Sequence, residues 1–220
     1  MASIGVLAIN SEIASTYIDA IQFWGADAFY LTSNYDNFEI DNQMNGIVIG
    51  GSSNVPASLY GINSSEFESE LYYDKMSIKV LMQALNSNIP ILGLNRGMHL
   101  LNIAMGGSLV QDVSGHNHLS ENELKQHHIW ISPGSKLATV LGSGGRVRVN
   151  SLHSNGFREA QKAPRLLASA YSVNDFLIEG IESPDHRFVV GIQCSPERQE
   201  EVPRQFQQLF ESLVYFSELA

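Results

Sequence analysis

The stretch that decides the fold spans residues 90–107 and reads PILGLNRGMHLLNIAMGG. Its first part, 91–94, is a short apolar strand that enters a sharp turn, and an apolar helix follows the turn. This is the form of a nucleophile elbow, where a reactive Ser or Cys stands at the apex of a strand-to-helix turn. Here the apex is Asn95, and a carboxamide cannot attack a carbonyl. The stretch therefore indicates a hydrolase-like scaffold without its usual nucleophile.

The turn also has a purely structural interpretation. Gly93 and Gly97 bracket it, and Gly97 allows the helix to approach the strand closely whether or not any group reacts. Asn is among the non-glycine residues that best tolerate a positive φ. Asn95 can thus preserve the elbow without taking part in chemistry, and both interpretations stay open.

Outward from the elbow, strands and helices alternate through the first half of the chain. Apolar runs predict strands over 3–9, 28–32 and 46–49, and helical spacing predicts helices over 11–24, opened by Ser-Glu cap chemistry, and over 66–85. The second half offers short strands over 129–131, 146–149, 166–171, 176–182 and 188–193, then a helix over 202–219. This pattern predicts an α/β fold with a mostly parallel sheet covered on both faces, and additional antiparallel strands in the second half.

Composition narrows the classes of function. The chain has 220 residues, is 44% hydrophobic and fits one domain over 1–220. Its net charge of −10, with 13 Lys and Arg, argues against nucleic-acid and membrane partners. We expect a small-molecule ligand, and leave open a protein partner or homo-oligomer. With one cysteine, Cys194, no secretory signal and no apolar span of ~18 residues, we expect a cytoplasmic protein.

Three further motifs accompany the elbow: IGGSSNVPASLYG at 49–61, VNSLH at 149–153 and GIQCSPE at 191–197. In this order and spacing, the motifs resemble the class I glutamine amidotransferase-like superfamily, and more closely its γ-glutamyl hydrolase-like branch, the C26 peptidases. The resemblance covers about residues 4–197. It implies a flavodoxin-like three-layer α/β/α sandwich. In active members it implies a Cys-His-Glu triad that cleaves a γ-glutamyl amide through a thioester.

The triad itself does not carry over to this chain. The nucleophile position is Asn95 and the base position is Ser195, and only the acid, Glu197, matches the family. The position one helical turn after the nucleophile is His99 instead of Gln, and Cys194 replaces the Trp before the base. The resemblance therefore predicts a protein without glutaminase or γ-glutamyl hydrolase activity that keeps a pocket for a γ-glutamyl-like or other amino compound. The same resemblance assigns substrate contacts to Gly50, Gly51, Arg96, His153 and Gln193.

An enzyme of altered chemistry is the alternative. His99 lies four residues after Asn95, so both side chains share one face of the helix. Ser195, His99 and Glu197 then form a rearranged Ser-His-acid set for amide or ester hydrolysis, with the Asn95 amide and the Gly51 N–H as oxyanion donors. Strand alternation turns Cys194 away from Ser195, which predicts a buried, inert thiol.

The remaining histidines give a weaker signal. His116-x-His118 has the spacing of half a metal site, but no spaced carboxylate or third histidine completes it. We therefore expect no metal site and no cofactor. Solvated positions are predicted for five histidines, and structural or surface roles for three acids: His116, His118, His127, His128 and His186, and Asp27, Asp74 and Glu179.

Overall fold

The computed structural model describes residues 1–31, 44–51, 54–61, 68–113, 115–116 and 125–220. This part of the chain forms a nine-stranded sheet in the order β2-β1-β3-β4-β9-β8-β7-β5-β6. The strands are β1 Ser3–Leu7, β2 Asp27–Tyr30, β3 Gly46–Ile49, β4 Ile91–Leu94, β5 Gln126–Ile131, β6 Gly145–Asn150, β7 Leu167–Ser172, β8 Ile178–Glu182 and β9 Val189–Ile192. The α-helices are α1 Ser11–Phe23, α2 Glu68–Asn86, α3 Arg96–Ala104, α4 Lys136–Val140 and α5 Gln208–Glu218.

The sheet is divided into a parallel and an antiparallel half. From β2 through β1, β3 and β4 to β9, every neighbouring pair is parallel. From β9 through β8, β7 and β5 to β6, every pair is antiparallel. The predicted α/β class is confirmed, with antiparallel pairing in the second half of the chain.

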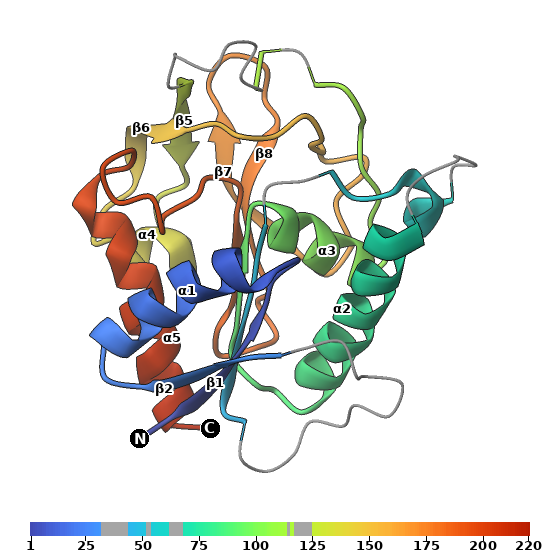
Figure 1. Cartoon of the computed structure of the whole chain (residues 1–220). Coiled ribbons are helices and arrows are strands. Elements are labelled where there is room, and N and C mark those ends of the chain that lie inside the picture. Colours follow the sequence, from blue (N-terminus) through green and yellow to red (C-terminus); the bar gives the residue numbers. More distant parts are fainter. Residues whose placement is uncertain (32–43, 52–53, 62–67, 114, 117–124) are drawn as a thin grey trace.

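Helices cover both faces of the sheet, which gives three layers (Figure 1). One apolar core lies beneath α1, α4 and α5, and includes Tyr17, Phe206 and Phe210. The other lies beneath α2 and α3, and includes Val80 and Leu101. In the parallel half, the carboxyl ends of β1, β3, β4 and β9 therefore meet at one edge, where ligands of open α/β sheets bind.

Three local predictions were wrong in detail. The helix predicted over 202–219 begins after Pro203 as a 3₁₀ turn, Arg204–Gln207, and becomes α-helical only in α5. The cap of α1 is Asn10, whose side chain accepts a hydrogen bond from the Ile13 N–H.

β8 starts later than predicted because Phe176 has a φ of 59° and cannot continue a strand. The short helix α4 was not predicted, although Ser135 caps it.

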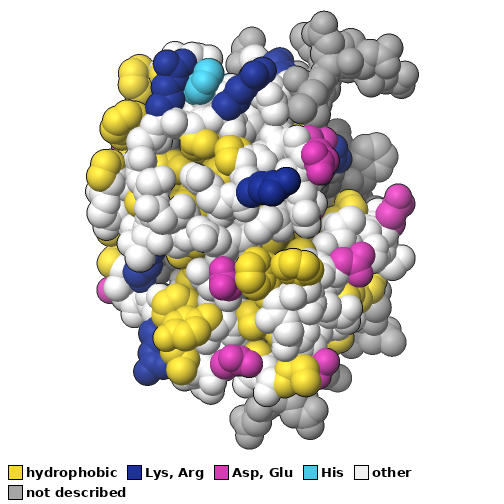
Figure 2. All heavy atoms as spheres, turned by 90° about the vertical axis from the view of Figure 1, so that its left-hand side faces the viewer, with side chains coloured by type: hydrophobic (Ala, Val, Ile, Leu, Met, Phe, Trp, Pro, Cys, Tyr) yellow, Lys and Arg dark blue, Asp and Glu magenta, His cyan; other side chains and the backbone are white. Residues whose placement is uncertain are grey.

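Figure 2 shows the face of the molecule covered by α1 and α5. Acidic and basic side chains both appear on it, separated by polar and apolar surface. Phe23 of α1 and Tyr215 of α5 are exposed apolar side chains. None of the described helices has the length and apolar content needed to cross a bilayer.

Candidate functional site

The elbow has the strained geometry that the sequence predicts. Asn95 lies between β4 and α3 with φ 50° and ψ −107°, outside the regions that L-residues normally occupy. Its backbone N–H donates to the Ile192 carbonyl at 2.8 Å, which joins the end of β4 to the end of β9. Adding a Cβ to Gly97 would place it 1.9 Å from the Ile49 carbonyl oxygen, so α3 packs directly on β3. The positive φ at Asn95 and the close approach at Gly97 are both confirmed.

The three positions that correspond to the family's triad are neighbours in space. The Asn95 amide nitrogen lies 3.5 Å from the Ser195 hydroxyl. Asn150 fixes the Ser195 backbone, because its side chain accepts from the Ser195 N–H at 2.9 Å and donates to the Ser195 carbonyl at 3.1 Å. Glu197 follows on the same loop, and its carboxylate interacts with Ser195. The scaffold thus holds an amide, a hydroxyl and a carboxyl in series.

Glu197 has an environment that favours its neutral form. Burial raises the pKa of this carboxyl from 4.5 to about 7, against smaller lowering effects of its own backbone N–H, Arg198 and the Ser195 hydroxyl. One of its oxygens has no hydrogen-bond partner in the described part of the chain. A carboxyl of this kind can either donate or accept a hydrogen bond near neutral pH.

His99 is held by Gln193 instead of Ser195. The His99 Nε2 lies 2.6 Å from the Gln193 Oε1, and the Gln193 amide donates to the Asn95 Oδ1 at 3.2 Å. The Asn95 amide also donates to the Leu152 carbonyl at 3.3 Å. Asn95 and His99 are each 2% exposed. His99, Gln193, Asn95 and Ser195 therefore form one buried chain of polar contacts.

Burial lowers the pKa of His99 from 6.5 to about 3, so the folded protein keeps this imidazole neutral. Below pH 6.5 the unfolded chain binds a proton at His99 that the folded chain does not bind, and the free energy of unfolding falls as the pH drops from 6.5 towards 3. We expect His99→Gln to reduce this slope by up to about 1.4 kcal/mol per pH unit. Urea unfolding at several pH values between 4 and 8 measures the slope of the free energy of unfolding against pH. Equal slopes for the natural protein and His99→Gln would contradict the prediction.

The Gly-Gly turn after β3 packs against Tyr17. The Gly50 N–H donates to the Leu7 carbonyl, so it is not directed at a ligand. Burial raises the pKa of the Tyr17 hydroxyl well above its usual range, and the nearby Gly51 backbone lowers it by a smaller amount. The oxyanion-type donor assigned to Gly51 thus lies next to a tyrosine hydroxyl. Ser52 and Ser53 lie outside the described residues.

Arg96 is not placed to contact a substrate. Its side chain is fully buried, and its Nε and Nη2 donate to the two oxygens of Asp74 at 3.0 and 2.7 Å. A further guanidinium nitrogen donates to the Asn54 carbonyl. The predicted substrate contact at Arg96 was therefore wrong, and the predicted structural role of Asp74 takes the form of a buried ion pair between α2 and α3.

A cavity of about 230 Å³ opens beside Ser195. Glu12, Tyr17, Gly51, Glu197 and Arg198 contribute to its walls. Asn95 and His99 do not line this cavity, because the Gln193 network buries them. A ligand in the cavity would thus meet the hydroxyl and the carboxyl of the triad-equivalent set, but not the elbow.

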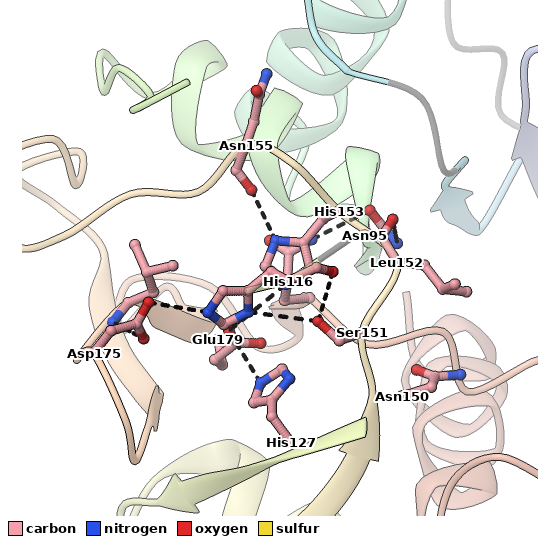
Figure 3. Close-up of polar contacts among 12 residues, drawn as sticks. Asn95, His116, His127, Asn150, Ser151, Leu152, His153, Asn155, Asp175 and Glu179 are labelled. Atoms are coloured by element: carbon pink, nitrogen blue, oxygen red, sulfur yellow. Dashed lines mark hydrogen bonds and ion pairs between the residues drawn. The ribbon is translucent and has the colours of Figure 1, made fainter. Parts of the chain in front are cut away.

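A group of histidines lies behind the elbow (Figure 3). His116, His127 and His153 are buried around the fully buried Glu179. The predicted solvated positions of His116 and His127 were wrong. Pairing of β5 and β8 with β7 brings His127 near Glu179, and a backbone hydrogen bond from the His153 N–H to the His116 carbonyl joins the two loop segments. His153 lies in this group rather than on the described cavity wall. His118 lies outside the described residues.

Cys194 is buried, as predicted. Its side chain is 2% exposed within the core beneath α1 and α5. Burial raises the pKa of its thiol well above the usual range, and Glu179 and Glu197 add to this effect. A thiol of this kind is a poor nucleophile.

Sequence reasoning missed two residues that shape the site. The Asn150 side chain positions the Ser195 backbone, and the Tyr17 hydroxyl lies next to the Gly51 backbone. Asn150 gave a usable signal, since a polar side chain at the end of a strand often serves a neighbouring loop. Tyr17 gave none, because its spacing marks only the apolar face of α1.

Comparisons with known proteins agree with this architecture. The family model for peptidase C26 matches residues 6–197. The γ-glutamyl-γ-aminobutyrate hydrolase PuuD of Escherichia coli is 32% identical over 167 residues, which cover 70% of this chain and 65% of that protein. The solved CTPS glutaminase domain of Trypanosoma brucei with bound acivicin aligns with a TM-score of 0.72 and 15% identity, over 100% of this chain and 94% of the other. A glutamine amidotransferase of Thermotoga maritima gives a TM-score of 0.64 at 18% identity, over 99% and 84%. The chain belongs to the peptidase C26 family, and its fold is that of the glutamine amidotransferases.

Proposed function

We propose that this protein binds a small γ-glutamyl-like or other amino compound and does not hydrolyse it through a thioester. The observation that carries the proposal is the series Asn95, Ser195 and Glu197. The Asn95 amide nitrogen stands 3.5 Å from the Ser195 hydroxyl, where a cleaving member of the family would need a thiolate and a base. A carboxamide and a hydroxyl supply neither group.

The cavity has the charge pattern of a site for a zwitterion. Glu12 offers a carboxylate to an ammonium group, the Glu197 carboxyl can accept a hydrogen bond from it, and Arg198 offers a guanidinium to a carboxylate. Ser195 and Tyr17 also line the cavity. The name of the E. coli relative points to γ-glutamylated amines as the first compounds to test.

The rearranged Ser-His-acid hydrolase receives no support from these contacts. Its base would be His99, but the His99 Nε2 is engaged by Gln193 at 2.6 Å. The other ring nitrogen of His99 is buried and has no partner in the described part of the chain. Among the described residues, Ser195 therefore has a carboxyl and an amide beside it, and no imidazole is placed to take its proton.

Purified protein incubated with L-glutamine, γ-glutamyl-γ-aminobutyrate and γ-glutamyl-p-nitroanilide is expected to release ammonia, glutamate or p-nitroaniline only at the rate of a blank. A glutamine-analogue chloroketone should leave position 95 unmodified in a peptide mass map. Turnover above the blank that Ser195→Ala abolishes would instead establish the hydrolase.

Binding is tested separately by calorimetry with the same compounds and with glutamate as the minimal ligand. We expect saturable binding that Arg198→Ala weakens about tenfold, because one charge-assisted hydrogen bond is worth ~1.5 kcal/mol. Arg165→Ala is the matched control, because it removes an exposed arginine that does not line the cavity. Absence of binding by all these compounds, together with absence of turnover, would contradict the proposed function.

A further inference from the structure

Four side chains that come from distant parts of the sequence converge behind the elbow (Figure 3). Glu179 is 0% exposed, and the rings of His116, His127 and His153 surround it. We propose that His116, His153 and Glu179 bind a divalent transition-metal ion of the Zn²⁺ type. The inference does not rest on the proposed function.

The three ligand atoms lie close enough together to hold such an ion once the site contracts around it. One ligand atom from each residue lies within 4.8 Å of the others. The Glu179 Oε1 is 3.7 Å from the His116 Nδ1 and 3.8 Å from the His153 Nε2. Zinc bonds of about 2.0–2.2 Å in a tetrahedron separate the ligand atoms by about 3.3–3.6 Å. The two distances from Glu179 therefore need to shorten by a few tenths of an ångström, and the ligand nitrogens of His116 and His153, which lie up to 4.8 Å apart, need to approach each other by roughly 1 Å.

Both imidazoles are oriented so that a lone pair faces the centre. The His153 Nδ1 lies 2.8 Å from the Asn155 carbonyl, which can only accept a hydrogen bond, so the proton is on Nδ1 and Nε2 is free. The His116 Nε2 lies 3.0 Å from an Asp175 carboxylate oxygen, which leaves its Nδ1 free in the same way. A carboxylate and a backbone carbonyl are the usual acceptors for the second ring N–H of a metal-binding histidine.

Ser151 does not compete for the free nitrogen of His116. Its hydroxyl donates to the His116 backbone carbonyl at 2.9 Å, and lies 3.5 Å from the His116 Nδ1. The single hydroxyl proton is thus directed to the carbonyl, and the lone pair of Nδ1 remains available.

Unpaired buried polar atoms give a second, independent indication. Both oxygens of Glu179, the His153 Nε2 and both ring nitrogens of His127 lack a hydrogen-bond partner within the described residues, although all are buried. Buried polar groups without partners cost free energy, and a buried carboxylate costs most. A dication bonded to Glu179 and His153 would give the carboxylate and the His153 Nε2 a partner and would balance the buried charge.

His127 serves as a positioning residue. Its Nε2 lies 3.3 Å from the Glu179 Oε1 without making a hydrogen bond, so the ring packs against the carboxylate and restricts its position. Two imidazoles and one carboxylate favour Zn²⁺ and its neighbours over Mg²⁺ or Ca²⁺, which prefer all-oxygen sites. Three protein ligands leave the fourth position of a tetrahedral ion to a water molecule.

The test uses the full-length chain after removal of metal with a chelator. Titration with Co²⁺ is expected to give the ligand-field absorption of a four-coordinate site, saturating at one equivalent, and Zn²⁺ is expected to displace it. A spectrum that stays that of hydrated Co²⁺, with the protein folded by circular dichroism and no Zn²⁺ retained after desalting, would overturn the proposal. This measurement requires no variant.

Substitutions then distinguish a metal site from a structural polar cluster. Glu179→Gln should abolish Co²⁺ binding. Asp175→Asn, which touches no ligand atom directly, should weaken Zn²⁺ binding about 10- to 100-fold. His127→Gln should weaken it about tenfold, and His128→Gln, on the opposite face of β5, should leave it unchanged. If Asp175→Asn binds Zn²⁺ as tightly as the natural protein, the ligand assignment is wrong. This conclusion holds even if Glu179→Gln does not fold.

Discussion

Replacing Arg96 with alanine is expected to lower the free energy of unfolding by about 3–5 kcal/mol, the cost of breaking a buried ion pair by removing one partner. Both side chains of the Arg96–Asp74 pair are 0% exposed. Removal of the guanidinium leaves the Asp74 carboxylate buried without its counter-charge, at the contact between α2 and α3. Urea unfolding at pH 7 measures the change.

An exposed arginine provides the matched control. Arg165 makes a similar two-nitrogen contact with Asp185, but its side chain is 73% exposed. Water screens this pair, so Arg165→Ala should cost no more than about 1 kcal/mol. A loss at Arg96 as small as that at Arg165 would mean that water reaches the Asp74 carboxylate.

Gly97→Ala is expected to destabilise the fold by at least about 4 kcal/mol, or to prevent folding. The added Cβ would lie 1.9 Å from the Ile49 carbonyl oxygen, which belongs to the backbone of β3 and cannot move aside alone. Alanine has the higher helix propensity by about 1 kcal/mol, so any loss reflects the clash between α3 and β3. Circular dichroism and thermal unfolding measure it.

Gly25→Ala is the control for backbone strain alone. Gly25 has φ 85° with no atom within 4 Å of an added Cβ, so alanine there should cost about 1–2 kcal/mol. A Gly97→Ala variant as stable as Gly25→Ala would show that α3 can move away from the sheet, and would contradict the tight elbow.

Much of the architecture could be predicted because local patterns encode it. The limits of β3 and β4 match the predicted runs over 46–49 and 91–94 without change. The positive φ of Asn95 follows from the turn that its glycine neighbours require. Where prediction failed, as at Pro203 and Phe176, one residue's backbone conformation made the predicted element start later than its periodic pattern.

In the candidate site, too, some features follow from the local sequence and others from tertiary contacts. The sequence by itself determined which groups are present: an amide at 95, a hydroxyl at 195, a carboxyl at 197, and no thiol or imidazole at the first two positions. Only the tertiary structure decided that His99 pairs with Gln193, that Arg96 pairs with Asp74, and that three histidines surround Glu179. The reason is that spacing along one strand or helix fixes which side chains share a face. Contacts between residues 22 to 94 positions apart depend instead on how the helices pack, which strands pair and in which register.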